Sequence, residues 1–399
     1  MRSLFKPALI AALLAASSLL DAPAASAQDL NFSIPLPLSG PLSFTGTVEQ
    51  GGWQHVVDYI NKNGGIRGRK IVATYWDDEY KVDIGVAGFK KAAAEGGVVF
   101  SSGDGTPFIR AISPENNERY KILISNQGFS SDLIDTAKYK YHFLPGLTYS
   151  DMVDLLFRYI KSKQGNGAAP KVALVYSATE FGRDPIAHAR DEAKRQGIDI
   201  VLEDETKFTG IDVTADAIKL RNAAADYVIF HGYAGNVWPE ILKLSRDYGV
   251  KSQFMGTIFC ADPEIVRGVG PVADGYIGVV PYNLVAKGSD APTLKVIDGY
   301  LKSWTGKPYT GNVSIGYMIA WAQALILREI IGKAIDAGKP LDGETLIAEV
   351  KAMKNWDSGG IFAEPVTFVD QRITSGVLYQ YHVTADQIVA TQLRLSAGN

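Results

Sequence analysis

The sequence predicts an α/β protein built from two doubly wound parallel sheets. Short β-rich runs alternate with amphipathic segments along most of the 399-residue chain. Helices between consecutive strands indicate parallel βαβ units with right-handed crossovers. The alternation occurs in two separate sets, and the chain exceeds the ~250–300 residues that one hydrophobic core usually supports. We therefore expect two lobes.

Strands and helices follow from residue type and periodicity. The expected strands are 31–38, 70–77, 97–102 and 121–126 in the first set, and 171–177, 198–204, 226–231 and 253–259 in the second. The expected helices are 47–62, 82–95, 106–119, 150–163, 180–196, 213–224 and 236–248. Helical patterns dominate 291–354 and strand patterns return in 361–393, so the chain is expected to cross between the lobes more than once.

The N-terminal segment 1–27 has the pattern of a secretory signal peptide. Arg2 and Lys6 provide a positive start, and an apolar run follows over residues 8–20. The small residues Ala25-Ser26-Ala27 then match the pattern that signal peptidase requires. We expect export and cleavage after Ala27.

Composition argues against a nucleic-acid or membrane partner and against a disulfide bond. The formal net charge is −3, and no cluster of Lys or Arg is present, so neither nucleic acid nor an anionic membrane surface is expected as a partner. Cys260 is the only cysteine, so an internal disulfide is excluded. We interpret Cys260 as a small buried apolar residue.

Polar, glycine-containing loops follow the expected strands, where open α/β sheets bind ligands. The candidate ligand-binding residues in these loops are Phe44, Ser102, Asp104, Thr106, Gly128, Phe129, Phe181 and Tyr233. Thr106 fits the N-cap of a helix and Pro107 its first turn, which leaves backbone N–H groups for a carboxylate. Asp104 could cap this turn, or it could meet a hydroxyl or amine of the ligand.

Catalytic and metal motifs are missing from the sequence. It contains no Gly-x-Ser-x-Gly elbow, no His-Glu-x-x-His and no Cys/His cluster of metal spacing. The histidines are scattered, and Asp77-Asp78 is interpreted as a pair of solvated turn carboxylates. We expect neither an enzyme nor a resident metal or cofactor, and a hydrolase is disfavoured.

The order of several segments resembles the leucine/isoleucine/valine-binding family of periplasmic proteins. These segments are SGPLSFTG, EQGGWQHVVDYINKNGGIRGRKI, YWDDEY, QFMGTIF and FVDQR. The resemblance implies a type I periplasmic binding fold, in which two Rossmann-like lobes are joined by a hinge with three crossings. It places lobe 1 in 28–146 plus 281–364 and lobe 2 in 147–280 plus 365–399. It also implies a monomeric periplasmic protein that delivers a small molecule to an inner-membrane ABC permease.

The same resemblance assigns roles to individual residues. Thr106, Gly128 and Phe129 match family loops that hold a ligand carboxylate, while Phe181 and Tyr233 match aromatic residues of the second lobe. Amino-acid binders of the family carry an acid two positions beyond the glycine of the QFMG segment, and that position is Ile258 here.

Ile258 bears on the class of ligand. Burying an ammonium ion without a partner costs several kcal/mol, so the ligand is expected to lack one. Aromatic residues in the loops, Phe44 among them, favour an apolar or aromatic carboxylate. Two alternatives remain open. One is an amino-acid binder in which Asp104 or Asp262 replaces the missing acid, and the other is a soluble periplasmic ligand sensor.

Overall fold

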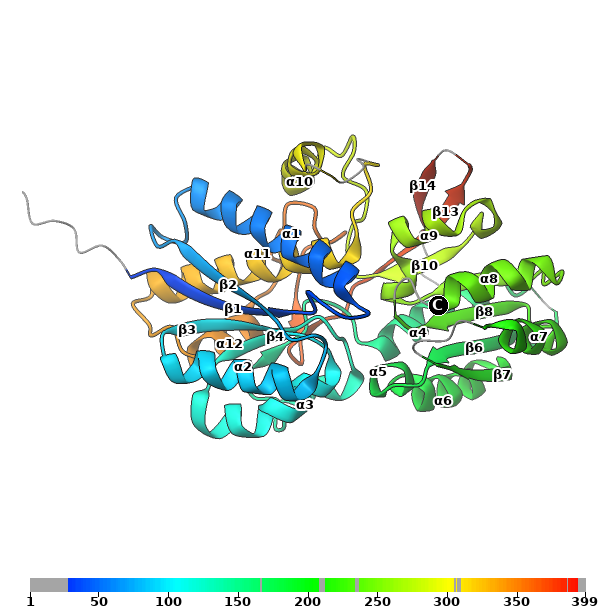
Figure 1. Cartoon of the computed structure of the whole chain (residues 1–399), viewed down its shortest axis with the longest axis horizontal. Coiled ribbons are helices and arrows are strands. Elements are labelled where there is room, and N and C mark those ends of the chain that lie inside the picture. Colours follow the sequence, from blue (N-terminus) through cyan, green and yellow to red (C-terminus); the bar gives the residue numbers. More distant parts are fainter. Residues whose placement is uncertain are drawn as a thin grey trace, which may run out of the picture.

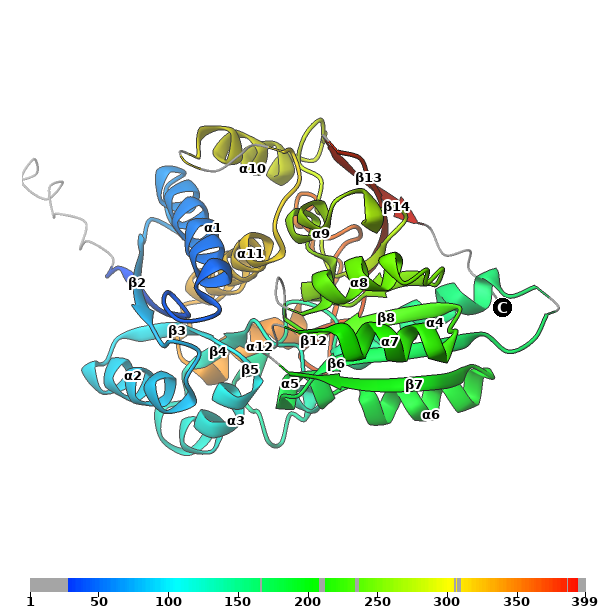
Figure 2. The same ribbon diagram turned by 45° about the vertical axis from the view of Figure 1, so that its right-hand side comes forward.

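The computed structural model describes two lobes that lie side by side (Figure 1). The described residues are 28–165, 167–207, 212–233, 237–304, 306, 310–385 and 387–393. The expected signal peptide lies outside them. Each lobe has a central sheet with helices on both faces, as Figure 2 shows from a second direction. The predicted α/β class is confirmed.

Lobe 1 is built on a five-stranded parallel sheet in the order β2-β1-β3-β4-β5. Its strands are β1 (Leu30–Leu36), β2 (Ile71–Asp77), β3 (Val98–Gly103), β4 (Leu123–Asn126) and β5 (His142–Phe143). Its helices are α1 (Ser43–Lys62), α2 (Val82–Glu95), α3 (Thr106–Glu115), α10 (Pro292–Ser303), α11 (Ile315–Asp336) and α12 (Gly343–Ala352). Central strands such as β1 are buried along nearly their whole length because helices cover both faces of the sheet.

Lobe 2 is built on a seven-stranded sheet in the order β14-β13-β10-β9-β8-β6-β7. The parallel strands are β6 (Lys171–Ser177), β7 (Asp199–Thr206), β8 (Tyr227–His231), β9 (Gln253–Gly256) and β10 (Ile277–Val280). The antiparallel hairpin of β13 (Val377–Val383) and β14 (Ile388–Leu393) extends one edge. The helices are α4 (Tyr149–Lys163), α5 (Glu180–Arg183), α6 (Ile186–Gln196), α7 (Thr214–Ala223), α8 (Trp238–Asp247) and α9 (Pro263–Val269).

Short elements account for most differences from the predicted boundaries. The segment 180–196 is divided between α5 and α6, with Pro185 at the N-cap of α6. The strand predicted over 253–259 ends at Gly256, and the 3₁₀ helix η3 (Ile258–Ala261) follows it. Cys260 within η3 is fully buried, as the sequence predicts. The remaining short elements are η1 (Asn116–Tyr120), η2 (Ser131–Ile134), η4 (Pro271–Ala273), β11 (Phe368–Val369) and β12 (Arg372–Ile373).

The chain crosses between the lobes at three places, the last of which differs from the expected position. The first crossing lies between β5 and α4, and the second follows β10. The third was expected near Pro365-Val366, but Val366 still pairs with Trp356, and the Phe368 ring lies 6.0 Å from that of Phe143 in lobe 1. The chain therefore enters lobe 2 between β12 and β13.

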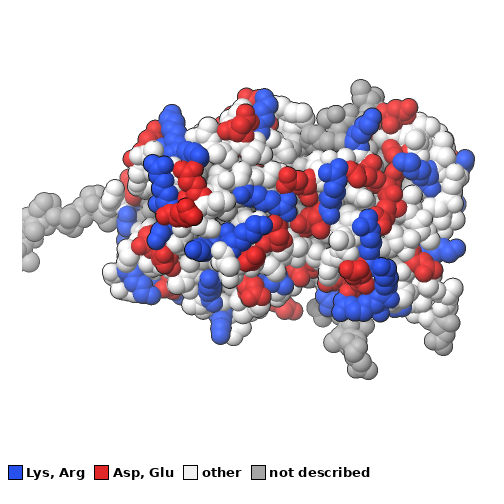
Figure 3. All heavy atoms as spheres, turned by 90° about the horizontal axis from the view of Figure 1, so that it is seen from below, with Lys and Arg blue, Asp and Glu red and all other residues white. Residues whose placement is uncertain are grey.

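Helix α11 is the longest helix described and packs along α1. In length and composition it could cross a membrane, but 83% of its most apolar window is buried inside the protein. It is thus a core helix of lobe 1. On the face shown in Figure 3, acidic and basic side chains are interspersed.

Candidate ligand-binding site

A cavity of about 320 Å³ lies between the two lobes. Lobe 1 contributes the loops after β1 and β3 and the N-terminus of α11, while lobe 2 contributes the loops after β6, β8 and β9. For comparison, an engineered cavity of about 150 Å³ holds one benzene molecule. The cavity therefore has room for more than a single aromatic ring.

The N-terminus of α3 forms part of the lobe-1 wall. The structure makes Gly105 the N-cap, not Thr106, and no side chain caps this helix end. The Thr106 hydroxyl lies 2.6 Å from the Ser130 hydroxyl and thus pairs away from the helix end. The backbone N–H groups of the first turn are therefore suited to an acceptor group of a ligand.

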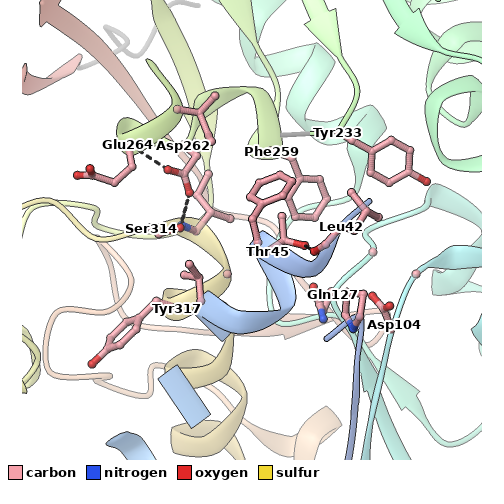
Figure 4. A pocket seen from close by; sticks show the side chains of 18 of the residues that line it. Leu42, Thr45, Asp104, Gln127, Tyr233, Phe259, Asp262, Glu264, Ser314 and Tyr317 are labelled. Carbon is pink, nitrogen blue, oxygen red and sulfur yellow. Dashed lines mark hydrogen bonds between the residues drawn. The ribbon is translucent and has the colours of Figure 1, made fainter. Parts of the chain in front are cut away.

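Gln127 and Gly128 continue this polar wall. The Nε2 atom of Gln127 is buried and has no hydrogen-bond partner among the described residues. A Cβ atom at Gly128 would lie 2.7 Å from Asn126 Nδ2 and 3.0 Å from Thr106 Oγ1, so the packing requires glycine here. Figure 4 shows Gln127 next to Asp104 at one end of the cavity.

Three buried acids lie at this end of lobe 1. Asp104 lines the cavity and is 7% exposed, while Asp78 and Glu49 behind it are 2% and 1% exposed. Burial raises the pKa of Asp78 to about 6, and burial followed by the charges of Asp78 and Glu49 raises the pKa of Asp104 well above its usual range. Burial also raises the pKa of Glu49. The sequence-based view of Asp78 as a solvated carboxylate is wrong, because the Asp78 side chain is 2% exposed and lies near Glu49 and Asp104.

Aromatic rings form much of the lobe-2 wall. The Tyr233 hydroxyl bonds the Tyr80 hydroxyl of lobe 1 at 2.8 Å, so this pair bridges the cavity. The ring of Phe181 lies 4.8 Å from that of Tyr233, 5.0 Å from that of Tyr149 and 5.8 Å from that of Phe259. The rings offer an apolar surface edged by hydroxyl groups.

The opposite end of the cavity holds carboxylates that already have partners. Asp262 of lobe 2 accepts hydrogen bonds from Ser314 Oγ at 2.6 Å and from the backbone N–H of Ile315 at 2.8 Å, at the N-terminus of α11 (Figure 4). Glu264 accepts from Thr310 Oγ1 and pairs with Arg267 at 2.9 Å. Asp262 and Glu264 therefore bridge the two lobes, and Glu264 also neutralises Arg267.

The structure brings most of the predicted residues together at the cavity and separates three of them from it. Those that line the cavity are Phe44, Asp104, Thr106, Gly128, Phe181 and Tyr233. Ser102 is buried with its hydroxyl toward Gln323, and Ile258 is fully buried inside η3. Phe129 is also fully buried, with its ring 6.2 Å from that of Tyr149, so it supports a lining residue from behind.

Several lining residues were not predicted. Tyr80 follows the YWDDEY carboxylates, and this position after β2 was the available signal. Tyr149 begins α4 at the first crossing. It does not lie in a loop that follows an expected strand, so no signal in the sequence marked it. Lining residues from the segment between α10 and α11, such as Thr310 and Ser314, lie far along the chain from the predicted loops.

One group of side chains in the described part of the chain could hold a metal ion. Asp154 of α4 and His188 and Glu192 of α6 place donor atoms within 4.8 Å of one another. His188 already bonds Asp154 at 2.7 Å, and Glu192 pairs with Arg195. None of these residues lines the cavity, so this group does not take part in the site.

Comparisons with known proteins agree with a ligand-binding cavity between two lobes. A family model described as periplasmic binding protein matches residues 32–387. The Leu/Ile/Val/Thr-binding protein of Salmonella typhimurium is 25% identical over 291 residues, which cover 68% of this chain and 73% of the relative. The Leu/Ile/Val-binding protein homolog 8 of Brucella abortus is 24% identical over 348 residues, or 82% of this chain and 81% of the relative.

Two solved structures illustrate the similarity of fold. A branched-chain amino acid ABC transporter protein from Thermus thermophilus with bound valine has a TM-score of 0.81 at 22% identity, covering 93% of this chain and 97% of the other. A solute-binding protein of an ABC transporter from R. palustris, in complex with 4-hydroxybenzoate, has a TM-score of 0.76 at 19% identity, covering 92% and 96%.

Proposed function

The chain belongs to the periplasmic binding protein family, and from this premise we propose that it captures a small molecule for an ABC importer. The ligand first docks on lobe 1, lobe 2 then closes over it, and the permease recognises the closed form. The observation that carries the proposal is the cavity enclosed by both lobes and bridged by Tyr80 and Tyr233. Contacts that the ligand makes with both lobes form only in the closed state. They therefore make the ligand bind the closed form more tightly than the open form, as hinge closure requires.

We propose an apolar or aromatic carboxylate-type ligand. The uncapped first turn of α3 and the Gln127 amide are donors for its carboxylate. Phe181, Tyr233 and Phe259 pack against its apolar part. The R. palustris protein named above binds an aromatic acid of this kind, and the Salmonella protein is named for amino acids, so the relatives support both ligand classes.

The remaining features of the proposal concern location and assembly. The chain is exported to the periplasm, is cleaved after Ala27 and acts as a monomer without chemistry of its own. Lobe 1 comprises 28–146 with the segment from 281 to the third crossing, and lobe 2 comprises the rest. Family membership supports the periplasmic location and the permease as partner.

A ligand screen followed by a measurement of shape tests the proposal. Branched-chain amino acids, aromatic acids, amides and polyols are screened by thermal shift. A true ligand at about 100 times its Kd stabilises the folded state by about 2.7 kcal/mol and raises the melting temperature by several degrees. The same ligand should reduce the radius of gyration in X-ray scattering. A ligand that binds by calorimetry yet leaves the radius unchanged would contradict hinge closure.

A further inference from the structure

A group of metal-ligating side chains lies between two helices of lobe 2, away from the ligand cavity. Asp154 belongs to α4, and His188 and Glu192 belong to α6. One donor atom of each residue, an imidazole nitrogen or a carboxylate oxygen, lies within 4.8 Å of the other two. Among the described residues this is the one set of three such side chains that comes so close together. Since none of the three lines the cavity, the function proposed above leaves them without a role.

The helical repeat and the packing of the two helices bring these residues together. His188 and Glu192 are four positions apart on α6, so their side chains lie on one face of that helix, about one turn apart. Helix α4 packs against α6 and brings Asp154 next to this face. Because the three residues come from two separate helices, no sequence motif marks them. The expectation of no resident metal was based on such motifs and could not take this group into account.

Glu192 is a buried acid on an otherwise apolar face of α6. The buried residues of this helix are Ile186, Ala189, Glu192 and Ala193. The Glu192 side chain is 7% exposed, whereas the side chain of its cationic partner, Arg195, is 73% exposed and free to be hydrated. Burying a carboxylate without a strong partner costs free energy, and an apolar residue at this position would pack without that cost. A second cation close to Glu192 would compensate the buried charge.

The distances between the donor atoms fit a small divalent cation. Bonds of about 2.0–2.2 Å from zinc to nitrogen and oxygen separate neighbouring donors of a tetrahedral site by about 3.4 Å. His188 Nε2 lies 2.7 Å from Asp154 Oδ1, and all three donors lie within 4.8 Å of one another, so small side-chain rotations suffice. The ion then takes the place of the proton between His188 and Asp154. The Gln196 amide donates to Glu192 and can keep it oriented, because a carboxylate oxygen has two lone pairs.

We propose that Asp154, His188 and Glu192 bind a divalent transition-metal ion of the zinc type, which links α4 to α6. One imidazole and two carboxylates form a donor set that zinc accepts, whereas magnesium and calcium prefer oxygen donors alone. Water completes the coordination, because the side chains of His188 and Asp154 are 39% and 29% exposed. The ion stabilises lobe 2 internally. It does not enter the cavity, so this site is independent of the proposed binding function.

Titration with zinc chloride tests the site on the unmodified protein, purified without a histidine tag and stripped of metal with a chelator. Calorimetry should show one zinc ion bound per chain. Zinc in excess of its Kd should raise the melting temperature by several degrees, because the ion binds only the folded arrangement of the two helices. Magnesium and calcium should produce neither effect. Cobalt(II) is a coloured substitute for zinc, and its visible absorption should change on binding as imidazole and carboxylate replace water.

Variants identify the ligands of the ion. His188→Ala should weaken zinc binding by about 100-fold or more, since even residues that only support a metal ligand contribute about 10- to 100-fold. Glu192→Gln keeps the shape of the buried side chain and should weaken zinc by at least about tenfold. His382→Ala is the matched control, because His382 lies 3.6 Å from Asp274 on the surface of lobe 2 and has no third metal-ligating side chain beside it among the described residues. It should leave the zinc affinity unchanged.

The outcomes decide between a metal site and a group of hydrogen-bonded charges. If zinc does not bind, or if His188→Ala binds it as tightly as the unmodified protein, the site is refuted and His188 only joins two acids. Equal losses in His188→Ala and His382→Ala would show scattered binding at surface histidines and would refute the site as well. Magnesium binding as tight as that of zinc would refute the transition-metal assignment. His188→Ala should bind the ligand of the cavity normally, so the ligand screen tests the proposed function separately.

Discussion

The two lobes contribute different chemistry to the same cavity. Lobe 1 presents polar groups whose partners are incomplete, namely the first turn of α3, the Gln127 amide and Asp104. Lobe 2 presents mainly rings, with Phe181 and Tyr233 packed edge to face. Polar groups with fixed geometry can orient a ligand before closure, whereas a ring surface becomes useful only when it covers an apolar body. The difference therefore favours docking on lobe 1 followed by closure of lobe 2.

Disturbing the polar wall of lobe 1 should have the largest effect. Gly105 has φ +85°, and a Cβ atom there would lie 2.8 Å from both Cε2 and the hydroxyl oxygen of Tyr80. Gly105→Ala should displace Tyr80 and the start of α3, and it should weaken binding by about 2–3 kcal/mol, roughly 30- to 150-fold. Calorimetry with the tightest ligand of the screen measures this loss.

Gly96→Ala provides the control for backbone strain. Gly96 also has a positive φ, +77°, but no atom lies within 4 Å of the added Cβ. Both variants should lose about 1 kcal/mol of folding stability to the strained backbone, Gly105→Ala should lose about 1–3 kcal/mol more from the displaced Tyr80 ring, and only Gly105→Ala should lose affinity. An equal loss of affinity in both would assign the effect to strain and remove the special role of the α3 turn.

Removing a ring from lobe 2 should have a smaller effect. Tyr233→Ala deletes one face of the aromatic wall and the bridge to Tyr80, and we expect binding to weaken by about 1.5–2 kcal/mol with little change in melting temperature. Tyr233→Phe keeps the ring and removes the hydroxyl, so it should lose only about 1 kcal/mol. Unchanged affinity in Tyr233→Ala would show that lobe 2 closes without using this wall.

The sequence predicted the lobes better than it predicted the side of each loop that faces the ligand. Strands and helices depend on local patterns, and the edge that lines the cavity follows from parallel topology, so Asp104 and Thr106 could be placed at this edge. Ile258 and Phe259 show the limit. The strand before them ends earlier than its residues suggest, and the following 3₁₀ turn directs Phe259 to the cavity and buries Ile258.

Contacts between distant segments lay beyond local patterns altogether. Tyr149 enters the site because the fully buried Phe129 ring packs behind it, and Asp262 reaches the N-terminus of α11 from the other lobe. The state of Asp78 likewise depends on what covers it, and a turn sequence alone suggests water. Burial, which decides the charge of such a group, is a property of the assembled fold.

The smallest effect is expected where the lobes meet at the surface. Arg110 of lobe 1 bonds Glu180 of lobe 2 at 2.7 Å, but the Glu180 side chain is 55% exposed, and exposed ion pairs contribute about 0–1 kcal/mol. Nearby, the Asp184 carboxylate is 5% exposed and accepts hydrogen bonds from the N–H and hydroxyl of Ser131. Glu180→Gln leaves this buried bridge in place.

We therefore expect Glu180→Gln to weaken binding less than about fivefold, and we expect the loss to disappear at high salt because exposed charges are screened. Titrations at low and high ionic strength measure it. A large, salt-independent loss would mean that the rim of the cleft, and not its polar and aromatic walls, controls closure. In that case the surface charges of lobe 2 would drive closure. The contrast between the polar wall of lobe 1 and the aromatic wall of lobe 2 would then explain only which ligand is selected.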